Sequence, residues 1–187
     1  GHPEWIPIDK YGVRKQGGPI EMAYPEARKA LVELICAYVS EAGYDGVMFF
    51  TYPENFSLRF TDEFGYSEPI VKEFKKRFGV DIIKDGFSKY ASKEDWYRLR
   101  GEYVTLFLKE LKTELSKKNV KLGMFIDPRN PRMPMVWACL PQVYPTAGGI
   151  YLDVDNWIKN GIVDELAVYG CSSRKIQASA VEDSLWL

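Results

Sequence analysis

Three continuous apolar runs, each entered from a helical pattern, constrain the fold of this chain more than any other feature. The first run, Val47 to Phe50, follows a pattern of helical spacing from Pro25 to Ala42 that begins with proline and stops at Gly43. An apolar run without polar alternation is typical of a strand buried on both faces, as in parallel sheets. The sequence therefore predicts a helix followed by a parallel strand.

The same pattern occurs twice more along the chain. A long helical pattern over 93–118 precedes a run over 120–126, and a short one over 153–160 precedes a run over 165–170. Another helix is predicted over 69–78, and a weak strand over 5–8. Helices between strands favour right-handed crossovers and a parallel sheet. We therefore expect an α/β fold class, of the (β/α)8 TIM-barrel type.

The connections after the strands are long, whereas those before them are short. The segments 51–68 and 127–149 are irregular, and the second is rich in proline. This asymmetry is typical of a barrel whose working face is at the carboxyl ends of its strands. Because a closed barrel takes about 250 residues and the chain has 187, we expect a partial barrel, forming one domain over residues 1–187.

Composition excludes several classes of function. The formal net charge is −1, from 25 basic and 26 acidic side chains, so the basic face of a nucleic-acid-binding protein is not expected. With 1 histidine and 3 widely spaced cysteines, a zinc site, a Ser-His-Asp triad and a disulfide framework are not expected either. The sequence has no apolar run of about 18 residues, and we expect no signal peptide in it. We expect no cofactor, no metal and no membrane contact.

Several short motifs resemble those of a bacterial family of glycoside-hydrolase-like (β/α) barrels, and they occur in that family's order over most of the chain. They are His2-Pro3-Glu4-Trp5, Ala23-Tyr24-Pro25-Glu26-Ala27-Arg28, Tyr44-Asp45-Gly46-Val47, Phe64-Gly65-Tyr66-Ser67-Glu68-Pro69-Ile70, Trp96 with Arg100-Gly101, and Asp155 with Trp157, Gly161 and Asp164.

The resemblance implies a carbohydrate substrate and a secreted or periplasmic location. It also implies that the three strands are barrel strands four to six. In related glycosidases the acid/base follows strand four and the nucleophile follows strand seven, so the second carboxylate would lie outside this chain. The family often has Asp or Arg just after strand four, whereas Thr51-Tyr52 stands there in this chain.

Two acids follow predicted strands and are the candidate catalytic residues. Glycoside hydrolysis needs two carboxyl groups flanking the scissile bond. Glu54 stands four positions beyond Phe50, and Asp127 directly follows the second strand. Glu54 could instead be a solvated loop acid, and Asp127, which precedes a proline, could instead begin a turn.

Other polar and aromatic residues near the predicted strand ends are candidates for binding substrate. Sugar rings stack on aromatic side chains, and their hydroxyl groups need polar partners. The candidates are His2, Glu4, Trp5, Tyr52, Asn55, Arg129, Trp137 and Tyr169. By contrast, Asp45, Asp81 and Asp164 stand at helix-to-strand connections, where we expect structural roles.

We therefore predict a hydrolase of O-glycosidic bonds in an oligo- or polysaccharide, acting by carboxylate acid/base chemistry. One alternative is a non-catalytic carbohydrate-binding barrel or an inactive fragment of a larger hydrolase. Another is a sugar lyase or isomerase, since barrels carry many chemistries. Self-association through exposed barrel edges is a further expectation.

Overall fold

The computed structural model describes residues 1–15, 19–50, 63–126 and 150–168. Its elements run in the order η1 (Pro3–Trp5), α1 (Pro25–Ala42), β1 (Gly46–Phe50), α2 (Glu68–Phe78), α3 (Lys93–Ser116), β2 (Lys121–Ile126), α4 (Val154–Lys159) and β3 (Glu165–Val168). The predicted helices and three apolar strands are confirmed, with bounds that differ by a few residues at most. The predicted strand over 5–8 does not form: Trp5 ends the 3-10 turn Pro3–Trp5, and Ile8 makes an isolated antiparallel bridge with Lys15.

The helix ends follow local rules. Pro25 opens α1, and Gly43 closes it with φ 68, a left-handed conformation that glycine adopts without strain. Ser92 caps α3: its hydroxyl accepts from the Asp95 N–H at 3.2 Å, and the Asp95 carboxylate accepts from the Ser92 N–H at 2.8 Å. This reciprocal pair satisfies two N–H groups that a helix start leaves unpaired.

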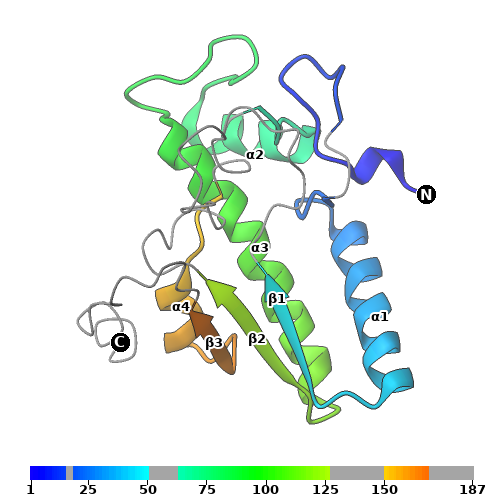
Figure 1. Ribbon diagram of the computed structural model, residues 1–187. Helices are drawn as coiled ribbons and strands as arrows, with labels where there is room; N and C mark the ends of the chain where they lie inside the picture. Colours follow the sequence, from blue (N-terminus) through cyan, green and yellow to red (C-terminus); the bar gives the residue numbers. More distant parts are fainter. Residues whose placement is uncertain (16–18, 51–62, 127–149, 169–187) are drawn as a thin grey trace, which may run out of the picture.

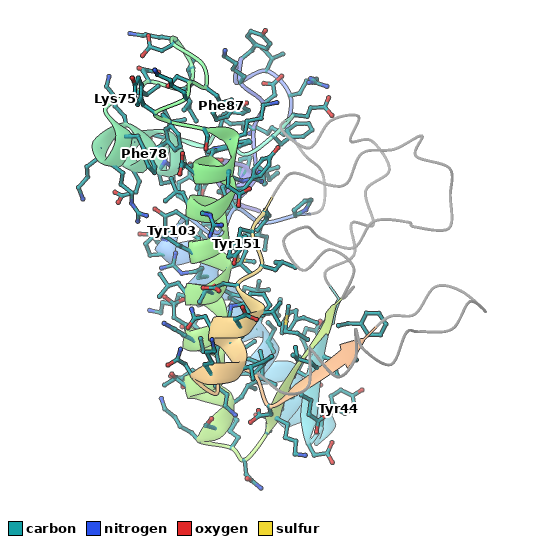
Figure 2. All side chains as sticks on the ribbon, turned by 90° about the vertical axis from the view of Figure 1, so that its left-hand side faces the viewer. Tyr44, Lys75, Phe78, Phe87, Tyr103 and Tyr151 are labelled. Atoms are coloured by element: carbon teal, nitrogen blue, oxygen red, sulfur yellow. The ribbon has the colours of Figure 1, made fainter. Side chains whose placement is uncertain are left out.

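The three strands form one parallel sheet in the order β1-β2-β3. Phe50 pairs with Phe125 across the first two strands, and Ile126 pairs with Val168 across the next two. Helices α1, α3 and α4 lie along one face of this sheet (Figure 1), and the side-chain view shows helices and sheet as separate layers (Figure 2). On the other face, Met48 is 40% exposed.

The expected barrel is wrong. The described residues form a small α/β fold, with one open three-stranded sheet and four α-helices, rather than a (β/α)8 barrel or strands four to six of one. Alternating helices and apolar strands specify parallel pairing between neighbouring units, which this sheet has. They do not specify how many units there are, or whether the sheet closes on itself.

The described interior has two hydrophobic clusters. The first lies between the sheet and helices α1, α3 and α4, and includes Leu111, Leu122 and Trp157. The second lies between α2, the amino-terminal half of α3 and neighbouring loops, and includes Phe74 and Trp96. Because α3 has 24 residues and β2 only 6, the helix is longer than the sheet and contributes to both clusters.

The amino ends of the strands are held by ionic contacts. The Asp164 carboxylate accepts from the backbone N–H of Leu122 at 2.8 Å and from the Lys112 ammonium at 2.6 Å. Although burial acts to raise the pKa of Asp164, these hydrogen bonds lower it. At the start of the loop after α2, Asp81 accepts from the N–H groups of Ile83 and Lys84. The predicted structural roles of Asp81 and Asp164 are confirmed.

Candidate functional site

The candidate site is the edge of the sheet where the strands end. Because Phe50 pairs with Phe125 and Ile126 with Val168, the segments after all three strands leave from one edge. In open α/β sheets, ligands bind outside this carboxyl edge. The segments that begin here carry most of the predicted site residues. Glu54, Asp127, Tyr52, Asn55, Arg129, Trp137 and Tyr169 lie outside the described residues.

The N-terminal segment lies beyond the same edge (Figure 1) and carries the three remaining candidates, His2, Glu4 and Trp5. The imidazole of His2 stacks on the Trp5 indole, with ring centroids 3.8 Å apart and an angle of 11° between the planes. The His2 Nδ1 lies 2.8 Å from Glu4 Oε1. The structure therefore brings these three predicted residues into one contact group.

This contact group changes the expected use of Trp5. Since His2 covers one face of the indole, a sugar ring can stack on Trp5 only from the opposite face, or else on the outer face of His2. The pKa of Glu4 is lowered by a hydrogen bond from its own backbone N–H and by the one from His2. Glu4 therefore carries a carboxylate charge beside the ring pair at neutral pH.

The turn that carries these side chains is fixed to the rest of the molecule by its backbone. The N–H of Glu21 donates to the carbonyl of Trp5 at 2.7 Å. The Lys15 ammonium donates to the carbonyl of Pro3 at 3.0 Å. Both partners lie outside the turn, so the position of the His2–Trp5 pair is set from two sides.

The Asp9 carboxylate bridges the loop that follows the N-terminal turn, from Asp9 to Arg14. It accepts from the N–H of Val13 at 2.9 Å, the N–H of Arg14 at 3.2 Å and the Arg14 guanidinium at 3.1 Å. Burial acts to raise the pKa of Asp9, but these three hydrogen bonds lower it. Arg14 also pairs with Glu63 and lies 5.4 Å over the Phe64 ring. Residues 63 and 64 lie at the end of the segment that carries Glu54, so the contacts of Asp9 and Arg14 hold that end of the segment in place.

Glu21 is a buried carboxylate at this edge, 6% exposed. The Ser67 hydroxyl donates to Glu21 Oε2 at 3.1 Å. Burial raises the pKa of Tyr24, and the charges of Glu21, Glu68 and Glu4 raise it further. Buried and exposed carboxylates therefore surround one phenol near the start of α1.

Besides Arg28, Arg100 is a second buried cation of the same region. Its guanidinium lies 4.7 Å over the ring of Trp96, where the face of the indole attracts positive charge. Burial lowers the pKa of Arg100, while the negative charge of Glu21 raises it. A Cβ added at Gly65 would lie 2.5 Å from Arg100 Cζ, so glycine at 65 leaves the room that the guanidinium occupies.

Gly101 allows the chain that follows residues 127–149 to pack closely against α3. A Cβ at this position would lie 1.9 Å from the carbonyl oxygen of Tyr151. The absence of a side chain lets Tyr151 lie directly on α3 (Figure 2) and donate its N–H to the carbonyl of Tyr97 at 3.0 Å. The guanidinium of Arg98 lies 4.4 Å over the Tyr151 ring. The chain returning from the segment with Asp127 is thus fixed to the helix that also carries Arg100.

Sequence reasoning missed Glu21, Ser67 and Arg100 as site residues. One signal for Arg100 was available, because it stands on the apolar stripe of α3 between Trp96 and Tyr103, where a charge must find a buried partner. No comparable signal marked Glu21. Its contact with Ser67 joins positions 46 residues apart, and residue spacing does not report such contacts.

In the part of the chain that the structure describes, no three His, Cys, Asp or Glu side chains are grouped so that they could hold a metal ion. Over the same ranges, none of the helices has the length and apolar character to cross a membrane.

No protein-family model matches the sequence, and no curated protein matches it either. Among solved structures, the chain is similar to a β-galactosidase from the psychrophilic Marinomonas ef1, with 13% identity and a TM-score of 0.40. The similarity covers 66% of this chain and 24% of the β-galactosidase chain. The chain thus matches about a quarter of the length of that enzyme.

Proposed function

We propose that this chain hydrolyses O-glycosidic bonds, with Glu54 and Asp127 as its two carboxyl groups. The observation that carries the proposal is the parallel pairing of β1 and β2, in which Phe50 lies opposite Phe125. Glu54 comes four positions after Phe50, and Asp127 comes two positions after Phe125. Both acids therefore belong to segments that start from neighbouring points of the carboxyl edge.

The spacing of parallel strands suits this chemistry. Neighbouring strands lie about 4.8 Å apart. Retaining glycosidases hold their carboxyl groups about 5 Å apart, and inverting ones about 6.5–9.5 Å apart. Side chains that follow two adjacent strand ends can reach either separation. One carboxylic acid would protonate the leaving oxygen, and the other would act as nucleophile or activate water.

The N-terminal turn supports the same proposal with groups suited to a sugar. The ring pair of His2 and Trp5 offers flat aromatic surface beside the ionised Glu4. Carboxylate and imidazole accept hydrogen bonds from hydroxyl groups, whereas aromatic faces contact the C–H face of a pyranose. The resemblance of His2-Pro3-Glu4-Trp5 to the motif of glycoside-hydrolase-like proteins agrees with this use.

The test is turnover of a panel of p-nitrophenyl glycosides by the full chain and by Glu54→Gln, Asp127→Asn and a control, Glu33→Gln. Glu33 is an exposed acid on α1, far in sequence from both candidates. We expect both candidate variants to lose at least a hundredfold in kcat, and the control to keep wild-type activity. All variants should keep the wild-type melting temperature.

Two results would contradict the assignment. Wild-type turnover by either candidate variant would remove that residue from catalysis. If the wild-type chain cleaves no glycoside but binds oligosaccharides in a glycan array, the chain is a carbohydrate-binding protein without hydrolase activity.

A further inference from the structure

The imidazole of His2 is held from two directions by its neighbours in the first turn. Glu4 Oε1 lies 2.8 Å from Nδ1, and the Trp5 ring covers one face at 3.8 Å. Together these contacts restrict both torsions of the His2 side chain. The His2 side chain nevertheless keeps 58% of its surface exposed, so the restraint leaves part of the ring accessible.

The contact with Glu4 also decides which nitrogen carries the proton. An ionised carboxylate only accepts hydrogen bonds, and the lowered pKa of Glu4 keeps it ionised at neutral pH. Nδ1 must therefore donate, and in the neutral imidazole Nε2 then holds the lone pair. This is the minor tautomer of free histidine, so Glu4 selects it.

We infer that Glu4 and Trp5 hold His2 as the Nδ1–H tautomer, so that Nε2 is a preset acceptor for a hydroxyl group of the carbohydrate substrate. This inference rests on the proposed function and names the atom that would contact the sugar. The titratable groups around the turn are the Glu4 carboxylate, the Lys15 ammonium, the amino group of Gly1 and the Tyr24 phenol, whose raised pKa keeps it neutral. Among the described residues, Glu4 is the hydrogen-bond partner of the imidazole.

Nuclear magnetic resonance tests the tautomer without any ligand. Because the chain has 1 histidine, a long-range ¹H–¹⁵N spectrum recorded at mildly alkaline pH reports His2 alone. We expect a protonated Nδ1 and an unprotonated Nε2 in the wild type. Glu4→Gln should give a mixture of both tautomers, because its amide oxygen accepts from Nδ1–H while its amide NH₂ can instead donate to an unprotonated Nδ1. Glu4→Ala should shift the population to Nε2–H, and Glu33→Gln should leave it unchanged.

A wild-type spectrum with Nε2 protonated would overturn the inference, because Nε2 could then not accept. A tautomer ratio that is equal in the wild type and Glu4→Ala would overturn it as well, because Glu4 would not be selecting the tautomer.

Kinetics on the p-nitrophenyl glycosides test the contact with substrate. His2→Phe keeps a ring to stack on Trp5 but has no nitrogen, whereas His2→Ala removes both. We expect each to lower kcat/KM about tenfold, the loss of one hydrogen bond of roughly 1.4 kcal/mol, with an unchanged melting temperature. Full activity of His2→Phe while Glu54→Gln is inactive would overturn the contact and leave the proposed function standing. If the wild type cleaves none of the glycosides, the proposed function and the contact fail together.

Discussion

The two halves of α3 lie in interiors of different chemistry. The carboxyl-terminal half packs on the sheet through Phe107, Leu108, Leu111 and Leu115, in a cluster that also takes apolar side chains from α1 and α4. The amino-terminal half packs through Trp96 and Leu99 in an aromatic cluster. Beside that cluster lie the buried polar groups Asp9, Glu21, Ser67 and Arg100.

The difference shows how the fold separates stability from function. The carboxyl-terminal half of α3 and the sheet, here called the sheet half, enclose a mainly apolar interior with a buried hydrogen bond from the Trp157 indole N–H to the Thr105 hydroxyl at 2.9 Å. Apolar packing tolerates change in detail as long as the volume is kept.

The amino-terminal half of α3 and its surroundings, here called the edge half, depend on charged groups that are costly to bury unless they are paired. Arg100 lies where the ends of both long segments meet α3, and the backbone N–H of Glu21 holds the N-terminal turn. We therefore expect substitutions in the two halves to change the free energy of unfolding by different amounts. In the edge half, this change should also depend on pH and on the presence of a charged partner.

The largest effect is expected for Arg100→Met in the edge half. Removing the guanidinium takes away the positive charge that acts on the buried Glu21 carboxylate and the contact with the Trp96 ring. Loss of one partner of a buried charge pair costs about 3–5 kcal/mol in free energy of unfolding. Urea denaturation measures this value. The double variant Glu21→Gln with Arg100→Met should recover at least about 1 kcal/mol, since the carboxylate on which the Arg100 charge acts is then removed as well. Additive effects of the two substitutions would mean that Glu21 and Arg100 are not coupled.

Leu111→Ala is the matching change in the sheet half. Leu111 is fully buried, and deleting a buried leucine side chain costs about 3 kcal/mol through lost burial and the cavity that remains. Because no titratable group is involved, the loss should be the same at pH 4 and pH 7 by urea denaturation. A loss that varied with pH would contradict the apolar description of this half.

Gly101→Ala tests the fixing of Tyr151 on α3. The added methyl group would overlap the Tyr151 carbonyl, so the chain at 151 must move away, at a cost of about 2 kcal/mol. Hydrogen exchange should accelerate at the Tyr151 N–H, which donates to Tyr97, while amides of β2 keep their protection. Exchange that accelerates equally in β2 would show that the two halves unfold together.

The sequence predicted the sheet half better than the edge half. Apolar periodicity and the capping signals of Pro25 and Gly43 depend on neighbours in the chain, and they located the helices and strands. The three strands were predicted, but their assignment to a barrel was wrong, because each helix–strand unit looks alike in a closed barrel and in an open sheet. In the edge half, His2, Glu4 and Trp5 were predicted and lie together. Glu21 and Ser67 meet only after folding, and nothing in their spacing announces the contact.

The smallest change in free energy of unfolding is expected for a substitution of Asp9. Unlike the effect of Leu111→Ala in the sheet half, this change should depend on pH. The folded-state pKa of Asp9 is lowered, so its ionised form stabilises the fold above the unfolded-state pKa of about 3.9. That contribution is lost as the pH falls through the lower folded-state pKa.

Asp9→Asn keeps an acceptor for the N–H groups of Val13 and Arg14 but removes the charge that faces the Arg14 guanidinium. At pH 7 we expect a loss of about 1–2 kcal/mol. The two proteins should converge as the pH falls through the lowered folded-state pKa of Asp9 and the wild-type carboxyl becomes neutral. Urea denaturation between pH 2 and 7 measures the difference, and a constant gap over that range would show that the ionised carboxylate does not stabilise this end of the molecule.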